Sequence, residues 1–244
     1  MTENVLITLL KKVSLNMMNG LAAFVDFFLP RFCPSCKAKL SIDEKVICTS
    51  CLSQIQRADC NRLQKEYEKK FRGQNIITDF ISLFVFEKDK PLQHIIHELK
   101  YSGKFSLGKY LGGLIAAELG DKLSEWKIDM IVPVPLHNLK RAERGYNQSD
   151  YIAKGIGPAL KIPVKTNLLK RNRFTETQTA LSLDERKENV KDAFSLKRKR
   201  RIPNKNILLI DDVITTGATT SECGRILLQN GAPKVFIASV AVAD

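Results

Sequence analysis

The sequence has no apolar run long enough to span a lipid bilayer, which takes about 18–20 residues. Its most apolar stretch, residues 21–29, is interrupted by Asp26. The apolar residues 5–10 precede Lys11 and Lys12, which is the reverse of the order in a secretory signal peptide. We therefore expect a cytoplasmic protein. The helical spacing of the apolar residues in 21–29 favours a helix docked on the rest of the chain. The alternative is peripheral contact with the inner face of the cytoplasmic membrane.

Glycine and proline are also scarce, at 13 and 9 of 244 residues, which excludes a collagen-like or low-complexity chain. Hydrophobic residues make up 44% of the chain, which excludes a disordered one. This length accommodates one large domain, or a main domain with a small appendage. The 39 Lys and Arg residues outnumber the 26 Asp and Glu residues and leave a formal charge of +13. Such a charge favours polyanionic partners, such as nucleic acid, nucleotides or anionic lipid.

Four of the six cysteines form two Cys-x-x-Cys pairs with 11 residues between them. Two such pairs supply four thiolates in a tetrahedron, the closed geometry of a structural Zn²⁺ site. Disulfides are disfavoured because nothing marks the chain as secreted, and the tandem arrangement argues against a redox-active pair. We expect structural Zn²⁺ bound by Cys33, Cys36, Cys48 and Cys51. Cys60 is expected to be a spare thiol, and Cys223 to pack within a helix.

Changes of composition divide the chain into four predicted parts. These are an N-terminal helical segment (1–32), a zinc ribbon (33–60), a charged connector or exposed helix (61–75) and a main domain (76–244). In the main domain, strands are predicted at 80–86, 128–135, near 163–171, 206–210 and 235–242. Helices are predicted from 91, and over 107–120, 147–156, 183–190 and 219–230. This alternation predicts an α/β fold with a mostly parallel sheet flanked by helices, whose ligand binds at the carboxyl ends of the strands.

The segment ILLIDDVITTGATTSE (207–222) contains the most informative of these strand ends. Asp211 and Asp212 follow a buried strand, and small residues and threonines then lead into a helix. Backbone N–H groups and hydroxyls at such a helix start suit a phosphate. Two carboxylates would repel a phosphate, and suit sugar hydroxyls or Mg²⁺ instead. The GK[ST] ending of a Walker A loop is missing. The segment therefore predicts a ligand with a phosphate and a sugar diol, bound with Mg²⁺.

Residues 210–220, IDDVITTGATT, resemble the binding motif of the type I phosphoribosyltransferases, whose ligand is phosphoribosyl pyrophosphate (PRPP). Further motifs follow the cysteine pairs in a fixed order. They are LKYSGK (99–104), VPVPLH (132–137), RAERGYNQS (141–149) and TQTALSLDERKENVKDAF (177–194). In that order, over about residues 20–244, the chain resembles the ComF family of late-competence proteins.

The resemblance implies a type I phosphoribosyltransferase-like fold that binds PRPP with Mg²⁺. Asp211 and Asp212 would hold the ribose hydroxyls. The 5′-phosphate would lie on Thr215, Thr216, Gly217, Ala218 and Thr219. The pyrophosphate loop would include Pro135, Leu136 and His137. Candidate contacts to pyrophosphate or to nucleic acid are Arg141, Arg144, Arg171 and Arg173, each of which could instead be a solvated surface charge. Residues 172–189 would form the flexible loop that closes over the site. Purine-type members often carry an acidic general base where this chain has Thr215, a poor base, so the catalytic residues and the acceptor stay open.

Resemblance and charge together predict a DNA-uptake factor in natural transformation. It would bind PRPP and single-stranded DNA and contact other proteins of the DNA-uptake machinery. The candidate DNA contacts are Lys197, Arg198, Lys199, Arg200 and Arg201, which could equally be a solvated loop. Aromatic residues that could stack on bases are sparse, with Phe105, Tyr146 and Phe174 as the candidates. One alternative is a metabolic phosphoribosyltransferase for a small nucleobase, which explains neither ribbon nor charge. Another is a PRPP-sensing regulator, although no helix-turn-helix is evident.

Overall fold

The computed structural model describes residues 28–173, 190–198, 202 and 204–243. It consists of two compact units that divide between Gln54 and Ile55. Most of the predicted segment 1–32, most of the predicted loop 172–189, and Lys199, Arg200 and Arg201 lie outside the described residues. Within the described residues, no helix is both long and apolar enough to cross a membrane.

The first unit is a small ribbon built on the two cysteine pairs. After the first pair the chain reverses, so that the Cys33 N–H donates to the Ala38 carbonyl at 2.9 Å. The second pair enters the short helix α2 (Thr49–Ser53). The Glu44 carboxylate accepts backbone N–H groups from Ser41 (2.9 Å) and Thr49 (2.6 Å), which ties the connecting turn to the helix start. The apolar core of this unit is small, with Leu40 and Ile47 buried beside the cysteines.

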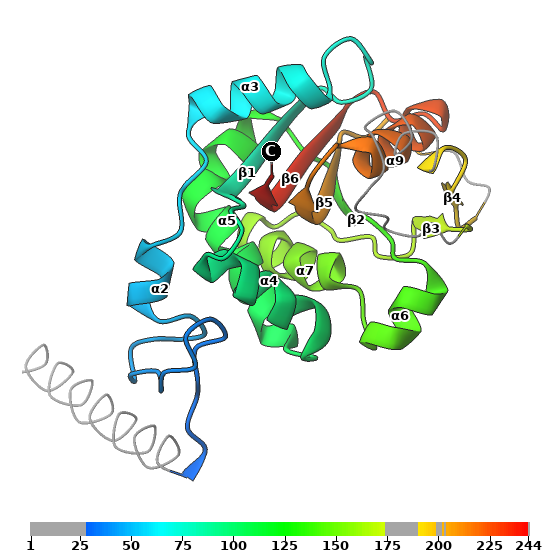
Figure 1. Ribbon diagram of the computed structural model, residues 1–244. Helices are drawn as coiled ribbons and strands as arrows, with labels where there is room; N and C mark the ends of the chain where they lie inside the picture. Colours follow the sequence, from blue (N-terminus) through cyan, green and yellow to red (C-terminus); the bar gives the residue numbers. More distant parts are fainter. Residues whose placement is uncertain (1–27, 174–189, 199–201, 203, 244) are drawn as a thin grey trace, which may run out of the picture. The chain divides into compact units, whose positions relative to one another are not determined.

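The second unit is built around a four-stranded sheet in the order β1-β6-β5-β2 (Figure 1). The strands are β1 (Asp79–Val85), β2 (Met130–Pro133), β5 (Ile207–Ile214) and β6 (Val235–Val242). All three pairings are parallel. The residues of β1, β5 and β6 are nearly all buried, as expected for a sheet covered on both faces. The predicted class, a parallel sheet flanked by helices, is confirmed.

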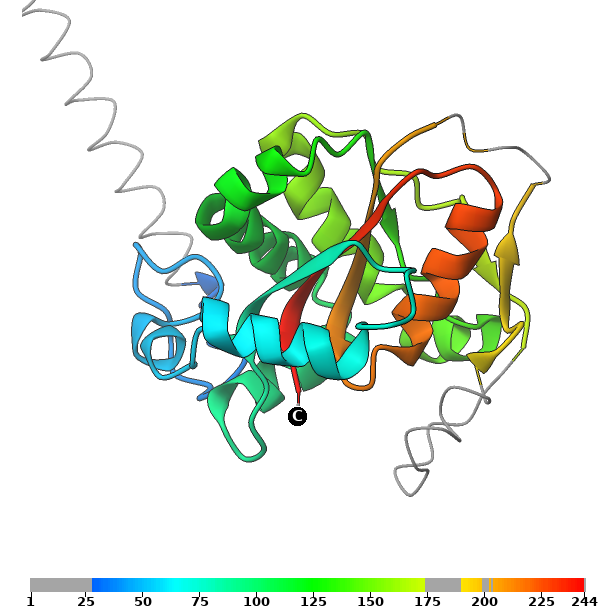
Figure 2. The same ribbon diagram turned by 90° about the horizontal axis from the view of Figure 1, so that it is seen from above.

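Helices cover both faces of this sheet. Figure 2 shows α3 (Cys60–Lys70) and α9 (Ala218–Gln229) on one face, and α5 (Phe105–Glu125) and α7 (Gln148–Leu160) on the other. Helix α4 (Pro91–Tyr101) packs on α5. The chain leaves β5 towards α9, and leaves β2 through α6 (Asn138–Arg144) towards α7 on the opposite face. A parallel sheet whose neighbouring strands connect to opposite faces opens a crevice at their carboxyl ends, where ligands bind.

Glycines let α5 and α7 approach closely. A Cβ atom at Gly112 of α5 would overlap the Ile152 carbonyl oxygen, and one at Gly155 of α7 would overlap the Lys109 carbonyl oxygen. The two backbones are therefore in direct contact at this crossing. This contact fixes α7, whose first residues reach the carboxyl end of β5.

Several elements differ from their predicted extents. The strand predicted at 206–210 continues to Ile214, because β5 pairs with β6 as far as Ile214 opposite Val242. The acidic pair thus lies inside β5, past its last pairing with β2 at Ile210. The strand predicted near 163–171 divides into two parts. Val164 forms an isolated parallel bridge with Ile131 of β2. The strand β3 (Leu169–Arg171) pairs with β4 (Phe194–Leu196) in a separate antiparallel sheet. Much of the predicted connector 61–75 is helix α3, which contacts β1.

Candidate functional site

The acidic pair lies where β5 extends beyond β2. The Asp212 side chain is 5% exposed and forms an ion pair with the Lys100 ammonium of α4, at 3.2 Å. The Gln148 amide of α7 donates to the same carboxylate oxygen at 3.2 Å. The neighbouring Ser149 hydroxyl donates to Asp211 at 3.3 Å. Residues from α4, β5 and α7 therefore meet at this strand end.

The two carboxylates differ in their affinity for protons. Burial and the adjacent charge of Asp212 raise the pKa of Asp211 to about 8. Burial also opposes ionisation of Asp212, but the Lys100 ammonium and the Val213 N–H outweigh it and lower the pKa of Asp212. Two carboxylates this close do not ionise independently. Near neutral pH the pair therefore carries about one negative charge, which a cation or a diol would stabilise.

The loop after β5 leads directly into α9. Gly217 is the N-cap of α9 and adopts a left-handed conformation with φ of 75°. A Cβ atom there would lie 2.6 Å from the Phe71 ring, so both the backbone angle and the available space require glycine. The Thr220 hydroxyl donates to the Gly217 carbonyl at 2.9 Å. The predicted phosphate residues 215–219 line a small hollow at the start of this helix, together with Asp211 and Val213.

Three cationic side chains, Lys100, Arg144 and Arg171, act on the acidic pair, and a fourth lies near all three. Burial, reinforced by the positive charges of Arg144, Arg171 and Lys100, lowers the pKa of Lys140. Burial likewise lowers the pKa of Arg171, although the nearby Asp211 attracts its charge. Like charges held this close repel one another, and a bound anion relieves that repulsion. We call Lys100, Lys140, Arg144 and Arg171 the cation cluster.

The predicted pyrophosphate loop follows β2. Pro135, Leu136 and His137 are half-buried, and His137 is the N-cap of α6, where its Nδ1 accepts the Leu139 N–H at 3.3 Å. Arg144 at the end of α6 donates to the Gln148 side chain at 3.1 Å, which links α6 to the acidic pair. Arg141 is exposed on α6.

The other predicted contacts lie elsewhere. Arg173 donates to the Lys191 carbonyl at 3.1 Å, and Lys197 and Arg198 are exposed just after β4. The structure thus brings Asp211, Asp212, Arg144 and Arg171 together, whereas the roles assigned to all these residues stay predictions.

Sequence reasoning missed Lys100, Gln148 and Ser149 as contacts of the acidic pair. It also missed Asn147, whose amide donates to the Val134 carbonyl (3.0 Å) and to Asp150 (2.9 Å). Asn147 thereby joins the start of α7 to the loop that follows β2. The signal was present, because all four residues belong to the motifs LKYSGK and RAERGYNQS.

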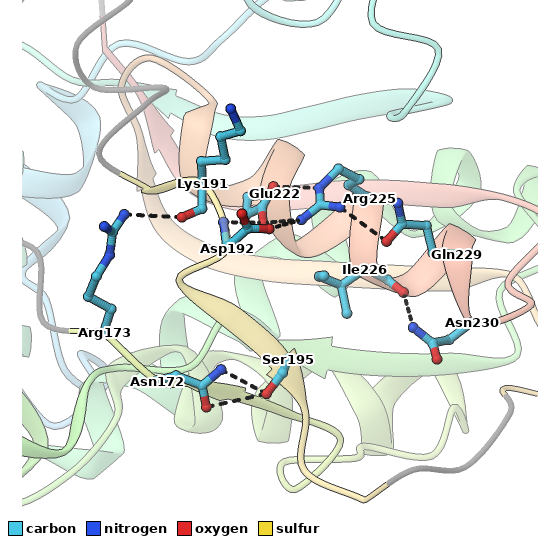
Figure 3. A network of polar contacts seen from close by, with 10 residues as sticks. All are labelled: Asn172, Arg173, Lys191, Asp192, Ser195, Glu222, Arg225, Ile226, Gln229 and Asn230. Carbon is cyan, nitrogen blue, oxygen red and sulfur yellow. Dashed lines mark hydrogen bonds and ion pairs between the residues drawn. The ribbon is translucent and has the colours of Figure 1, made fainter.

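A second polar network fixes the described residues on either side of 174–189 (Figure 3). Arg225 of α9 donates to Asp192 at 3.0 Å and to Glu222 at 2.6 Å, and Glu222 accepts the Asp192 N–H at 2.9 Å. Asn172 donates to the Ser195 hydroxyl at 2.9 Å. The β3–β4 pair is therefore joined to α9, the helix that begins at the end of the loop after β5.

The four predicted metal ligands come together in the first unit. The sulfur atoms of Cys33, Cys36, Cys48 and Cys51 all lie within 4.8 Å of one another. Zn–S bonds of about 2.3 Å place the sulfurs of a tetrahedron about 3.8 Å apart, and Cys36 Sγ lies 3.7 Å from Cys48 Sγ. Burial opposes ionisation of Cys33, but backbone hydrogen bonds outweigh it and lower the pKa of that thiol to about 7. These four cysteines could hold a metal ion.

Comparison with known proteins gives relatives along most of the chain. No family model matches. The chain is 29% identical to competence protein F of Haemophilus influenzae over 241 residues, which cover 90% of this chain and 100% of that protein. It is 30% identical to the DNA utilization protein YhgH of Escherichia coli over 229 residues, which cover 86% and 96%. It is 26% identical to competence protein ComFC of Bacillus subtilis over 202 residues, which cover 82% and 72%.

Solved structures give weaker matches. A purine phosphoribosyltransferase from Pyrococcus horikoshii is 20% identical, with a TM-score of 0.36 over 55% of this chain and 74% of that one. A glutamine PRPP amidotransferase from Bacillus subtilis is 19% identical, with a TM-score of 0.37 over 83% of this chain and 33% of that one.

Proposed function

Since this chain belongs to the ComF family of competence and DNA utilization proteins, we propose that it acts in DNA uptake by binding PRPP with Mg²⁺ and single-stranded DNA. One observation supports the proposal that the chain binds PRPP: three kinds of chemical group lie close together in the structure. An acidic pair, a glycine-capped helix start and four cations meet at the carboxyl ends of β5 and β2. PRPP presents a diol, a phosphate and a pyrophosphate, one for each of these groups.

Each part of the proposed ligand has a partner in this chain. Asp211 and Asp212 accept hydrogen bonds from the ribose hydroxyls. The backbone N–H groups and hydroxyls of 215–219 bind the 5′-phosphate. The cation cluster binds the pyrophosphate through charge-assisted hydrogen bonds. Carboxylate and phosphate oxygens are the ligands that Mg²⁺ prefers, and the ion neutralises charge on the pyrophosphate.

We propose binding without assigning an acceptor. If pyrophosphate is displaced, the cation cluster is suited to stabilise the charge that develops on it as it leaves. The proposal also covers structural Zn²⁺ on the four cysteines, contact with other proteins of the DNA-uptake machinery, and a cytoplasmic location with peripheral membrane contact.

Thermal unfolding with PRPP and Mg²⁺ tests the ligand site. A ligand at about 100 times its Kd stabilises the folded state by about 2.7 kcal/mol, which raises the Tm of a chain this size by roughly 5–10 °C. We expect this shift in the wild type and none in the D211N/D212N double variant. The matched control is Asp121→Asn, which changes an exposed acid of α5 and should keep the shift. A folded, zinc-loaded wild type that shows no shift would contradict PRPP binding.

A further inference from the structure

Aromatic side chains gather where α4 ends and α5 begins. Tyr101 and Phe105 are 51% and 45% exposed, and they are the exposed aromatic residues among the described part of the second unit. Phe105 stacks on the half-buried Tyr151 of α7, with ring centroids 4.7 Å apart and planes at 19°. Tyr146 supports Phe105 edge-on, with centroids 5.0 Å apart. We call Tyr101, Phe105 and Tyr151 the aromatic track.

Cations flank the aromatic track. The Arg144 guanidinium lies 5.2 Å from the centre of the Tyr101 ring, and the Lys154 ammonium lies 4.6 Å from the centre of the Tyr151 ring. Lys104 directly precedes Phe105, is exposed, and pairs with Glu98 at 2.7 Å. Exposed rings next to basic side chains suit a ligand that offers flat apolar faces joined by negative charges.

The aromatic track is continuous with the candidate PRPP site. Lys100, which pairs with Asp212, directly precedes Tyr101. Arg144 contacts the Tyr101 ring and also donates to Gln148, which in turn donates to Asp212. A chain of nucleotides lying on the track would therefore end beside the acidic pair.

We propose that the aromatic track, with Arg144 and Lys154, is the surface on which single-stranded nucleic acid binds. This inference rests on the DNA part of the proposed function. A single strand is favoured over a duplex because the faces of its bases are open to stacking, whereas duplex bases already stack on one another. The basic run at 197–201 would add only charge, since the exposed aromatic residues described in this unit lie on the track.

Fluorescence anisotropy with a labelled oligothymidylate of about 20 nucleotides tests the surface at low salt. Stacking on a protein ring typically contributes enough that its loss weakens binding roughly tenfold or more. We expect Tyr101→Leu and Phe105→Leu each to lose affinity for the oligothymidylate by this factor, and Phe105→Tyr to retain the wild-type affinity. The matched control is Phe32→Leu, an aromatic residue 53% exposed in the first unit. Because Phe105 also packs on Tyr151, Tyr101→Leu is the variant that leaves the packing of α5 intact.

An abasic strand of the same length separates stacking from charge. We expect Tyr101→Leu to bind the abasic strand as the wild type does. Lys154→Gln should weaken binding of both strands and reduce the slope of log K against log salt concentration by about 0.7. The control is Lys234→Gln, which changes an exposed lysine outside the track and should bind both strands as the wild type does. If Tyr101→Leu lost the same affinity for the abasic strand as for the oligothymidylate, the stacking role of Tyr101 would be overturned.

The outcomes distinguish the inference from the function on which it rests. A wild type that binds no single strand at low salt contradicts the DNA function, and the inference falls with it. A wild type that binds, together with track variants that bind equally well, overturns the inference alone. That second result would favour a protein partner for the exposed rings. The PRPP-dependent Tm shift tests the ligand site independently of either result.

Discussion

Asp211 is a residue whose ionisation lowers the stability of the folded protein. Its folded-state pKa of about 8 lies well above the value of about 3.9 expected in the unfolded chain. The folded protein therefore retains a proton that the unfolded chain releases. Stability is greatest below the unfolded pKa and is lost as the pH rises through about 8. A carboxylate kept at this cost is typical of a functional site.

We predict that Asp211→Asn stabilises the ligand-free protein, and more so at pH 8 than at pH 5. The Asn carbonyl can still accept the Ser149 hydroxyl, while the cost of ionising a half-buried carboxyl beside Asp212 disappears. We expect a gain of at least about 1 kcal/mol at pH 8, which is roughly 2–4 °C in Tm. Trp126 stacks on Phe236 of β6, so tryptophan fluorescence reports the unfolding of this unit. An equal gain at both pH values would contradict the assigned pKa.

At the same scale, the sequence reveals only part of the site. Asp211, Asp212 and the loop 215–219 are adjacent in sequence. They could be predicted because ligands of open parallel sheets bind at the carboxyl ends of the strands. Lys100 and Gln148 reach Asp212 only because α4 and α7 pack beside β5. The motifs LKYSGK and RAERGYNQS mark the two residues, but which carboxylate they contact depends on how the helices are packed.

At the scale of elements, burial decided what the sequence could predict. The starts of the helices at Pro91 and Gln148, and the whole strand 235–242, have strong apolar patterns and agree with their predicted positions to within one residue. The end of the second helix, predicted at 156, lies at Leu160. Helix α6 has no buried residue and hence no pattern, and it was missed. The length of β5 was missed as well, because pairing with β6 overrides the low strand preference of two aspartates.

The crossing of α5 and α7 gives a prediction with an internal control. Gly112→Ala should destabilise the protein by about 1–3 kcal/mol or more, because the methyl group meets the Ile152 carbonyl. Gly113→Ala should instead stabilise it by about 0.5–1 kcal/mol, because nothing lies within 4 Å and alanine is the better helix former. Denaturant unfolding followed by Trp126 fluorescence measures both. Similar effects of the two changes would mean that the helices cross elsewhere.

At the scale of the whole molecule, two units of very different size share one chain. The second unit has an extensive core on both faces of its sheet. The described part of the first unit buries few apolar side chains beyond Leu40, Ile47 and three of its four cysteines. A unit this small needs a metal or a cross-link to fold. The binding free energy of a metal on four thiolates would then be folding free energy for this unit.

Metal removal should therefore unfold the first unit alone. We predict that a strong chelator, or Cys36→Ser, abolishes hydrogen-exchange protection in 28–54 and leaves β5 and β6 protected, because those strands depend on their own core. Cys60→Ser removes an exposed thiol outside the four-cysteine cluster and should leave hydrogen-exchange protection unchanged in both units. Exchange followed by mass spectrometry resolves the two units. Loss of protection in both would show that the second unit depends on the metal, and sensitivity to a reductant but not to a chelator would indicate disulfides instead.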